Sequence, residues 1–479
     1  MQIPSEIVNS LFPLEYITQL FFWIQLLYNF FVPKALLIHS IEKSLVVAEQ
    51  PISIFPLLGV ITVAALFPES WEVNIADETI EEIDLDRKID LVGISTLTLN
   101  ASRAYDLADH FCNKGIPVLM GGMHPSALPE ESLQHADAVV VGEAEGIFDR
   151  VLSDLGNGRM KGIYKSEELP DISKVPHPRF DLLHPKHRRF IHSIQATRGC
   201  PHDCDFCSVT PFFGHRYRLR PVEDVVRDLR TSLEQASSRT VFFVDDNIGG
   251  NPRYAKEVFR ALIPLKIKWG SFASVAFTRD RELINLAVRS GCIELFIGFE
   301  SISQENLDTS HKSWVRANRM TEYIKIFHDH GIIVEGAFIF GHENDQKDIF
   351  RKTVDFVQTA GIQVPVFGIL TPYPATRLRA KLSNEGRLLP ESSNWRLYDG
   401  SHVLFRPAHM SPEELDEGFL WAKKYCSAPS SVFRRMFRAP RTHWLTALGL
   451  NFSMYFGRTK QIRARWPRSK GRLVRPVAW

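Results

Sequence analysis

An alternation of short apolar runs with helical patterns, which occurs twice along the 479 residues, constrains the fold more than any other feature. Strands separated by helical crossovers predict a parallel sheet with helices on both faces. In the first series the predicted strands are Ala35–His39, Glu72–Ile75, Leu91–Ser95, Val118–Gly121 and Ala138–Val141, and the predicted helices are Pro56–Phe67, Ala101–Lys114 and Leu128–His135. We therefore expect an α/β fold whose N-terminal part is a doubly wound, Rossmann-like parallel sheet.

The second series has six strand–helix units. Its predicted strands are His192–Thr197, Thr240–Val244, Trp269–Ala273, Leu295–Phe299, Val334–Phe340 and Val364–Leu370, and its predicted helices are Pro221–Glu234, Tyr254–Leu262, Glu282–Arg289, Val315–His330 and Asp348–Thr359. Six such units predict an open, partial (β/α)6 version of the TIM barrel. In both kinds of fold, ligands bind beyond the carboxyl ends of the strands.

Prolines and changes in composition divide the chain further. Four prolines between residues 170 and 185 exclude a regular helix or a central strand from the stretch between the two series. The expected segments are a hydrophobic N-terminal extension (1–33), the first α/β domain (34–164), a linker (165–190), the second α/β domain (191–390) and a mainly helical C-terminal extension with a basic amphipathic tail (391–479). In that extension we expect Ser411 to be a helix N-cap. The Glu414–Tyr425 helix should close the flank of the barrel or cover the substrate.

Three of the six cysteines, Cys200, Cys204 and Cys207, lie within eight residues in the spacing C-x3-C-x2-C. Each thiolate can bind one iron of a cubane cluster, and such clusters usually have four cysteine ligands. Three ligands would leave one iron with an open coordination site. The alternatives are cysteines that only pack, or a zinc site with His202 or His215 as its fourth ligand. Zinc sites usually combine two cysteine knuckles, and no second knuckle follows.

The motif, with Phe206 before its last cysteine, resembles the signature of the radical S-adenosylmethionine (SAM) superfamily. The resemblance implies that the three cysteines hold a [4Fe–4S] cluster whose open iron is chelated by the amino and carboxylate groups of SAM. An electron from an external donor of the flavodoxin or ferredoxin type would then cleave SAM to methionine and a 5′-deoxyadenosyl radical. A primary carbon radical of this kind can take hydrogen from an unactivated C–H bond.

Polar residues and glycines follow successive strands of the second series, where the site of a βα barrel lies. The resemblance implies that Asp246 and Asn247 meet the amino group of SAM. It also implies that Gly298 and Glu300 lie near the ribose or the methionine end, and that Gly341 lets the backbone approach adenine. The Thr-Pro-Tyr-Pro stretch at 371–374 is expected near the substrate.

The strand ends of the first domain carry seven candidate cofactor-binding residues: Ser95, Thr96, Gly121, Gly122, His124, Gly142 and Glu143. The stretches G-G-x-H-P (121–125) and V-G-E-x-E (141–145) resemble the cobalamin-binding domain fused to a large subset of radical SAM enzymes. The motif D-x-H-x-x-G, whose histidine ligates cobalt in many cobalamin proteins, does not occur in the sequence. Two interpretations stay open: cobalamin bound without a protein ligand below the cobalt, or a flavodoxin-like domain kept for packing. We expect His124 in a loop near the ligand, as a hydrogen-bonding group rather than a cobalt ligand.

The resemblance implies cobalamin-dependent methylation of an unactivated carbon. Hydrophobic and basic chain ends suggest a lipid-like substrate, as in the hopanoid methylases of the family. One alternative is radical SAM cyclisation, rearrangement or carbon–carbon bond formation without methyl transfer. Another is a non-catalytic metal-binding interaction protein. The sequence does not name the substrate, and no catalytic residue can be assigned beyond the cofactor ligands.

The charge is unevenly distributed. The net charge is +2, but residues 431–479 contain twelve Lys or Arg residues and no Asp or Glu, which leaves −10 on the rest. Such a tail suggests a membrane surface, whereas nucleic acid is unlikely because no RNA-binding signature accompanies it. The uncharged stretch from Tyr16 to Val32 is shorter than the ~20 residues of a spanning helix, so we expect an interfacial or core-packed helix rather than a membrane anchor. The lack of a disulfide framework indicates a cytoplasmic protein, and the basic and hydrophobic chain ends add an expected association with a membrane surface.

Overall fold

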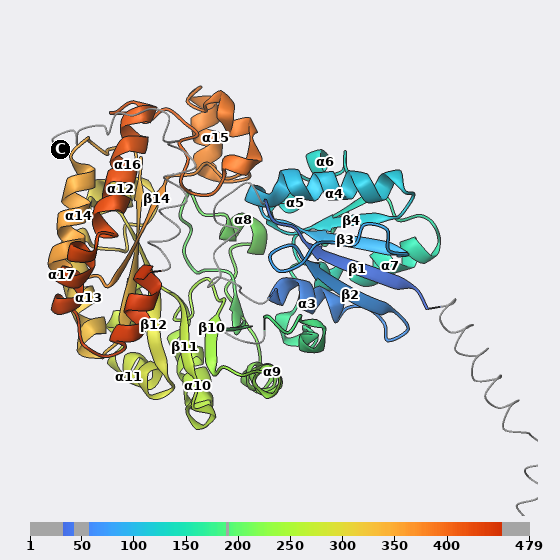
Figure 1. The fold of residues 1–479 in the computed structure, drawn as a ribbon, viewed down its shortest axis with the longest axis horizontal. Coiled ribbons are helices and arrows are strands. Elements are labelled where there is room, and N and C mark those ends of the chain that lie inside the picture. Colours follow the sequence, from blue (N-terminus) through green and yellow to red (C-terminus); the bar gives the residue numbers. More distant parts are fainter. Residues whose placement is uncertain (1–31, 43–56, 188–190, 453–479) are drawn as a thin grey trace, which may run out of the picture.

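The computed structural model describes residues 32–42, 57–187 and 191–452, and it contains two α/β units that lie side by side (Figure 1). The N-terminal extension and the last part of the basic tail lie outside the described residues, so the expectations for them stay predictions. Among the described helices, none combines the length and the apolar character that a membrane-crossing helix needs.

The first unit is built on a six-stranded parallel sheet with the strand order β2-β1-β3-β4-β5-β6. Its strands are β1 (Lys34–His39), β2 (Glu72–Asp77), β3 (Leu91–Ser95), β4 (Val118–Gly121), β5 (Ala138–Val141) and β6 (Gly162–Lys165). Its helices are α3 (Leu58–Ala64), α4 (Ala101–Asn113), α5 (Met123–Ala127), α6 (Pro129–Ser132) and α7 (Phe148–Gly156).

Alternating side chains of β1 explain why both faces of this sheet are covered. Leu36 and Ile38 join the hydrophobic cluster that contains Phe111 of α4. Ala35 and Leu37 point to the other face and join the cluster that contains α3 and Phe148 of α7. Because successive side chains of a strand point to opposite faces, a continuous apolar strand requires helices on both sides. The doubly wound sheet predicted from the sequence is confirmed.

The second unit is an open barrel whose parallel strands follow the order β7-β10-β11-β12-β13-β14. Its strands are β7 (His192–Ile194), β10 (Thr240–Phe243), β11 (Lys268–Ala273), β12 (Cys292–Glu300), β13 (Ile333–Phe340) and β14 (Val364–Ile369), and a small antiparallel ladder joins β8 (Thr197–Arg198) to β9 (Arg218–Leu219). The helices are α8 (Val209–Phe213), α9 (Val222–Glu234), α10 (Pro252–Leu262), α11 (Arg281–Arg289), α12 (Gln304–Thr309), α13 (Met320–Asp329), α14 (Ile349–Ala360) and α15 (Arg377–Asn384). The six predicted strand–helix units are confirmed.

The C-terminal extension forms α16 (Pro412–Cys426) and α17 (Pro429–Arg438), preceded by two short 3-10 turns, Pro390–Ser393 and Trp395–Leu397. Ser411 caps α16 through a capping box with Glu414. Helix α16 packs on α14 and β14, so it covers the flank of the barrel as expected. The 3-10 turns instead reach the first unit, where Arg396 pairs with Glu42.

Several elements differ from the prediction. The helix expected at Leu128–His135 is shortened to α6, which begins only at Pro129 because Leu128 is not helical. Helix α5, which precedes it, was not expected. Strand β6 was not expected, since its sequence Gly-Ile-Tyr-Lys shows little apolar periodicity. Short helices α12 and α15 were also missed, because each is less than three turns long and mostly polar.

Candidate functional site

The three cysteines occupy the loop between β8 and α8, on the side of the barrel that faces the first unit (Figure 1). The loop begins at Gly199, whose φ of +84° is left-handed and whose added Cβ would lie 2.7 Å from the Arg216 carbonyl oxygen. Glycine is therefore required at the turn that leads into Cys200. All three cysteines are free and partly exposed.

The thiols suit a metal cluster chemically. Burial raises the pKa of the Cys204 and Cys207 thiols to about 11, so a cationic partner such as iron is needed to hold them as thiolates at neutral pH. Within residues 32–42, 57–187 and 191–452, no three Cys, His, Asp or Glu side chains are grouped around one single-ion position. In a cubane each thiolate binds a different iron, so three thiols on one short loop fit a cluster.

Two aspartates after β10 hold the backbone that leads into the cysteine loop. Asp245 is fully buried and accepts hydrogen bonds from the Ala196 N–H at 3.1 Å and the Thr197 hydroxyl at 2.5 Å. Asp246 accepts from the Gly199 N–H at 3.1 Å. Burial raises the pKa of Asp245 to about 7 and that of Asp246 to about 6. One oxygen of the Asp246 carboxylate therefore holds the start of the cysteine loop through the Gly199 N–H.

Other candidate SAM-binding residues lie around the same loop. Asn247 is buried, and its side-chain oxygen has no hydrogen-bond partner among the described residues. The ring of Phe206 packs against the barrel core and lies edge-on to His342. Gly341 donates its N–H to the Asp345 carboxylate at 2.8 Å. A Cβ at Gly341 would meet Leu415 and Phe405 at 3.0 and 3.1 Å, so this glycine is also needed for packing.

Glu300 and Lys312 form a buried ion pair near the thiols. Their side chains are 11% and 9% exposed, and the Lys312 ammonium donates to the Glu300 Oε1 at 2.7 Å. A Cβ at Gly298 would lie 2.2 Å from that same oxygen, which explains the glycine. Burial alone would lower the pKa of Lys312, but Glu300 and the Cys204 thiol raise it above its ordinary value. Lys312 was missed in the sequence because it is a single lysine in a polar loop.

A cavity of about 230 Å³ opens at the carboxyl ends of the first sheet. Five of the seven residues expected there line it: Ser95, Gly121, Gly122, Gly142 and Glu143. The remaining wall is mostly aliphatic and aromatic, and it includes Phe212 and Phe213 of α8. A Cβ added at Gly142 would have no atom within 4 Å, so this glycine borders open space. Among the described residues no histidine lines the cavity, in line with the missing D-x-H-x-x-G motif.

Thr96 and His124 do not line this cavity. His124 lies in α5 rather than in a loop, because the chain after Gly122 turns directly into a helix. Its ring is fully buried, contacts the Tyr105 hydroxyl at 2.9 Å and lies edge-on to Trp395 of the C-terminal extension. Burial lowers the pKa of His124 to about 4. The structure therefore places His124 in a packed helical position between α4 and the C-terminal extension rather than in the expected loop, and its role beside a ligand stays a prediction.

A second cavity, of about 280 Å³, lies where five segments meet. It is lined by the segment after β3 (97–99), by α5, by the end of the cysteine loop with α8, and by residues 373–375 and 398–399. Tyr373 and Pro374 belong to the stretch predicted to lie near the substrate. Phe212 lines both cavities, so the two adjoin at α8.

Comparisons with known proteins agree with this geometry. The family model of the radical SAM superfamily matches residues 194–357, and that of the B12 binding domain matches residues 45–152. The chain is 32% identical over 387 residues to a bacteriochlorophyllide d C-12(1)-methyltransferase of Chlorobaculum tepidum, which covers 79% of this chain and 84% of the relative. It is 31% identical to a bacteriochlorophyllide d C-8(2)-methyltransferase of the same organism, with 74% and 81% covered.

A solved structure supports the fold. The radical SAM methyltransferase TsrM from Kitasatospora setae, determined with cobalamin and a [4Fe–4S] cluster bound, matches with a TM-score of 0.65 at 16% identity, over 90% of this chain and 99% of that chain. The predicted cofactors, a [4Fe–4S] cluster, SAM and cobalamin, are confirmed at the level of the family. From its two domains and its relatives, this chain belongs to the radical SAM superfamily, among the enzymes that combine a B12-binding domain with a radical SAM core to methylate carbon.

Proposed function

We propose that the enzyme methylates a carbon of a tetrapyrrole-class substrate that binds in the second cavity. The observation that carries this proposal is the position of Phe212, which lines both cavities beside the cysteine loop. A substrate in the second cavity would therefore adjoin both the methyl donor and the radical source. Leu97, Met123 and Tyr373 give this cavity an apolar and aromatic wall, which suits a flat, apolar ring system.

The relatives support the substrate class. The two relatives at 32% and 31% identity are named as methyltransferases of bacteriochlorophyllide d, a tetrapyrrole. Several polar side chains also line this cavity, and polar groups of this kind orient a ligand; they are Thr98, Ser126, Ser208, Tyr373, Tyr398 and Asp399. The lipid-like substrate suggested by the chain ends is the second candidate.

The protein's own residues would hold and separate the cofactors. When bound, the cluster with SAM supplies a radical that removes hydrogen, and cobalamin supplies the methyl group. In this proposal Cys200, Cys204 and Cys207 hold the cluster, and Ser95 with the glycines at 121, 122 and 142 borders cobalamin. Asp246, Glu300 and Lys312 surround the SAM site, and the extension around Tyr398 keeps water from the second cavity.

The test is an anaerobic assay of the reconstituted enzyme with methyl-labelled SAM and either bacteriochlorophyllide d or a hopanoid lipid. We expect labelled tetrapyrrole. Label found only in the hopanoid would overturn the tetrapyrrole class and favour the lipid-like substrate. Formation of 5′-deoxyadenosine with a product that carries no label would favour cyclisation or rearrangement instead.

A small-molecule substrate and an external redox partner are consistent with this family, and a flavodoxin or ferredoxin is the proposed electron donor. We also infer that the C-terminal helices rest on an anionic membrane surface. Phe433, Phe437 and Leu445 are 50%, 71% and 86% exposed, and the exposed Arg434 and Arg441 flank them. Apolar side chains flanked by arginines suit the boundary between lipid headgroups and acyl chains.

A further inference from the structure

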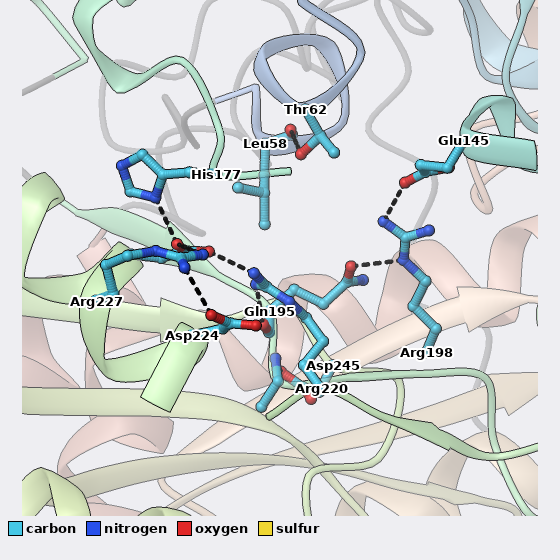
Figure 2. A network of polar contacts seen from close by, with 12 residues as sticks. Leu58, Thr62, Glu145, His177, Gln195, Arg198, Arg220, Asp224, Arg227 and Asp245 are labelled. Carbon is cyan, nitrogen blue, oxygen red and sulfur yellow. Dashed lines mark hydrogen bonds and ion pairs between the residues drawn. The ribbon is translucent and has the colours of Figure 1, made fainter. Parts of the chain in front are cut away.

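Arg198 joins the two units of the protein through a buried ion cluster. Its guanidinium is 8% exposed and donates to Gln195 Oε1 at 2.9 Å, to Glu143 Oε2 at 2.5 Å and to Glu145 Oε1 at 2.6 Å. Gln195 belongs to the barrel, whereas both glutamates follow β5 of the first unit. Figure 2 shows Arg198 between Gln195 and Glu145.

Each end of this ion cluster lies at a cofactor site. On the barrel side, Arg198 is the second residue before Cys200, in the strand from which the cysteine loop starts. On the other side, Glu143 and Glu145 line the first cavity directly after Gly142. The same guanidinium therefore touches a wall of the proposed cobalamin cavity and the base of the cluster loop.

The positive and negative charges of this ion cluster are equal in number, and their side chains are mostly buried. Arg218 of β9 also pairs with Glu143, so two arginines face two carboxylates. The Glu143 side chain is 3% exposed and that of Glu145 is 12% exposed. Buried charges of this kind depend on one another, because moving one leaves another without its partner. A shift of the loop that carries the glutamates must therefore shift Arg198.

A second ion cluster holds the barrel side in place. Arg220 donates to the Gln195 carbonyl oxygen at 2.9 Å and to Asp228 at 2.6 Å, and Asp228 also contacts His177 of the linker at 2.6 Å (Figure 2). The Gln195 main chain is thus fixed from behind. A displacement of Glu143 and Glu145 would therefore move the Arg198 side chain and the backbone toward Gly199, because the Gln195 main chain is held by Arg220.

We propose that Arg198 is a positioning residue that couples the cobalamin cavity to the cluster loop, so that cobalamin binding and SAM binding at the cluster strengthen each other. This inference rests on the proposed assignment of the first cavity to cobalamin. Cobalamin in the cavity would fix the wall that contains Glu143 and Glu145, and would thereby lower the cost of ordering the loop at Cys200. By linkage, SAM at the cluster strengthens cobalamin binding by the same factor.

The experiment measures the dissociation constant of hydroxocobalamin by absorbance, with the cluster-reconstituted enzyme, in the absence and presence of saturating SAM. In the wild type we expect SAM to tighten cobalamin binding on the order of tenfold, a typical size for coupled sites. In Glu145→Gln this factor should fall toward one, because the neutral amide no longer holds the guanidinium. Glu78→Gln is the matched control: it also weakens a buried ion pair, that of Glu78 with Arg103 in the first unit, but one that belongs to neither ion cluster and does not border the cavity.

Hydrogen exchange gives a second measurement that requires neither bound cobalamin nor catalytic activity. Hydrogen exchange of residues 199–207 should be faster in Glu145→Gln than in the wild type, whereas Glu78→Gln should leave it near the wild-type rate. The proposal is overturned if SAM leaves cobalamin affinity unchanged in the wild type, if Glu145→Gln keeps the wild-type factor, or if both variants lose it equally. Absence of cobalamin binding in every sample would instead refute the assignment of the cavity, and a missing methylation product would refute only the proposed function.

Discussion

The ammonium of Lys312 lies 2.7 Å from the carboxylate of Glu300, in a pair that is about nine-tenths buried beside the cysteine loop. Lys312 also lies over the ring of Trp314, 5.4 Å from its centroid, and that ring stacks on His202 of the cysteine loop. The end of β12 and the cluster loop are therefore connected through one lysine. Neither residue of the pair can be removed alone without leaving a buried charge.

The variant Lys312→Met should destabilise the protein by about 3–5 kcal/mol, because Glu300 then remains as an unpaired buried carboxylate. The double variant Lys312→Met with Glu300→Gln removes both charges and should recover at least half of that loss. Urea unfolding of the three proteins measures both effects. A single variant that costs less than about 1 kcal/mol would contradict the account of a tightly paired site.

Acid should weaken the fold through His124. Its folded pKa of about 4 lies below the ordinary value of 6.5, so between these values the unfolded chain binds a proton that the folded protein does not. The contribution of His124 to the free energy of unfolding is therefore complete above pH 6.5. It falls as the pH drops toward 4, by up to about 1.4 kcal/mol per pH unit. His124→Gln should flatten this part of the stability profile and leave the profile between pH 7.5 and 8.5 parallel to the wild type. Parallel profiles throughout would exclude His124 as the source.

Removal of the Phe212 ring should join the two cavities. In Phe212→Ala we expect the substrate and the methyl donor to be less well aligned. The ratio of 5′-deoxyadenosine to methylated product should therefore rise roughly tenfold. Phe213→Ala is the control, because Phe213 lines only the first cavity. An unchanged ratio in Phe212→Ala, or an equal rise in Phe213→Ala, would argue against a partition at this position.

The membrane proposal predicts selective binding to anionic vesicles. The full-length protein should sediment with vesicles that contain phosphatidylglycerol more than with pure phosphatidylcholine. The double variant Phe433→Ser with Phe437→Ser should bind roughly a hundredfold more weakly, since a fully buried phenylalanine contributes ~1.5–3 kcal/mol and these two are 50% and 71% exposed before binding. Ile163→Ser is a matched control, because Ile163 is 42% exposed on β6 of the first unit. If the wild type and the double variant bind anionic vesicles equally, these two phenylalanines are not part of a membrane-binding surface.

The sequence predicted the architecture well because parallel strands buried on both faces are continuous apolar runs. Leu91–Ser95 and Ala138–Val141 are such runs, and both are interior strands of the first sheet. Local spacing also located the cysteine loop, and five of the seven candidate residues of the first domain border the first cavity. These features depend on residues close to one another in the chain.

Contacts between distant segments could not be predicted in the same way. Lys312 meets Glu300 only because a polar loop folds back over the end of β12. Arg198 stands inside the Thr-Arg-Gly-Cys-Pro stretch, but its two glutamate partners lie more than fifty residues earlier in the chain. Likewise, His124 is packed by Trp395 of the C-terminal extension, which no local pattern reveals.

The most direct test of the account compares the wild type with Cys204→Ala after anaerobic reconstitution with iron, sulfide and hydroxocobalamin, using methyl-labelled SAM, a low-potential reductant and bacteriochlorophyllide d. We predict that the wild type forms 5′-deoxyadenosine together with labelled product, and that Cys204→Ala forms neither. Reductant-dependent cleavage of SAM that persists in Cys204→Ala, or a wild type that binds zinc without sulfide and cleaves no SAM, would contradict the central claim.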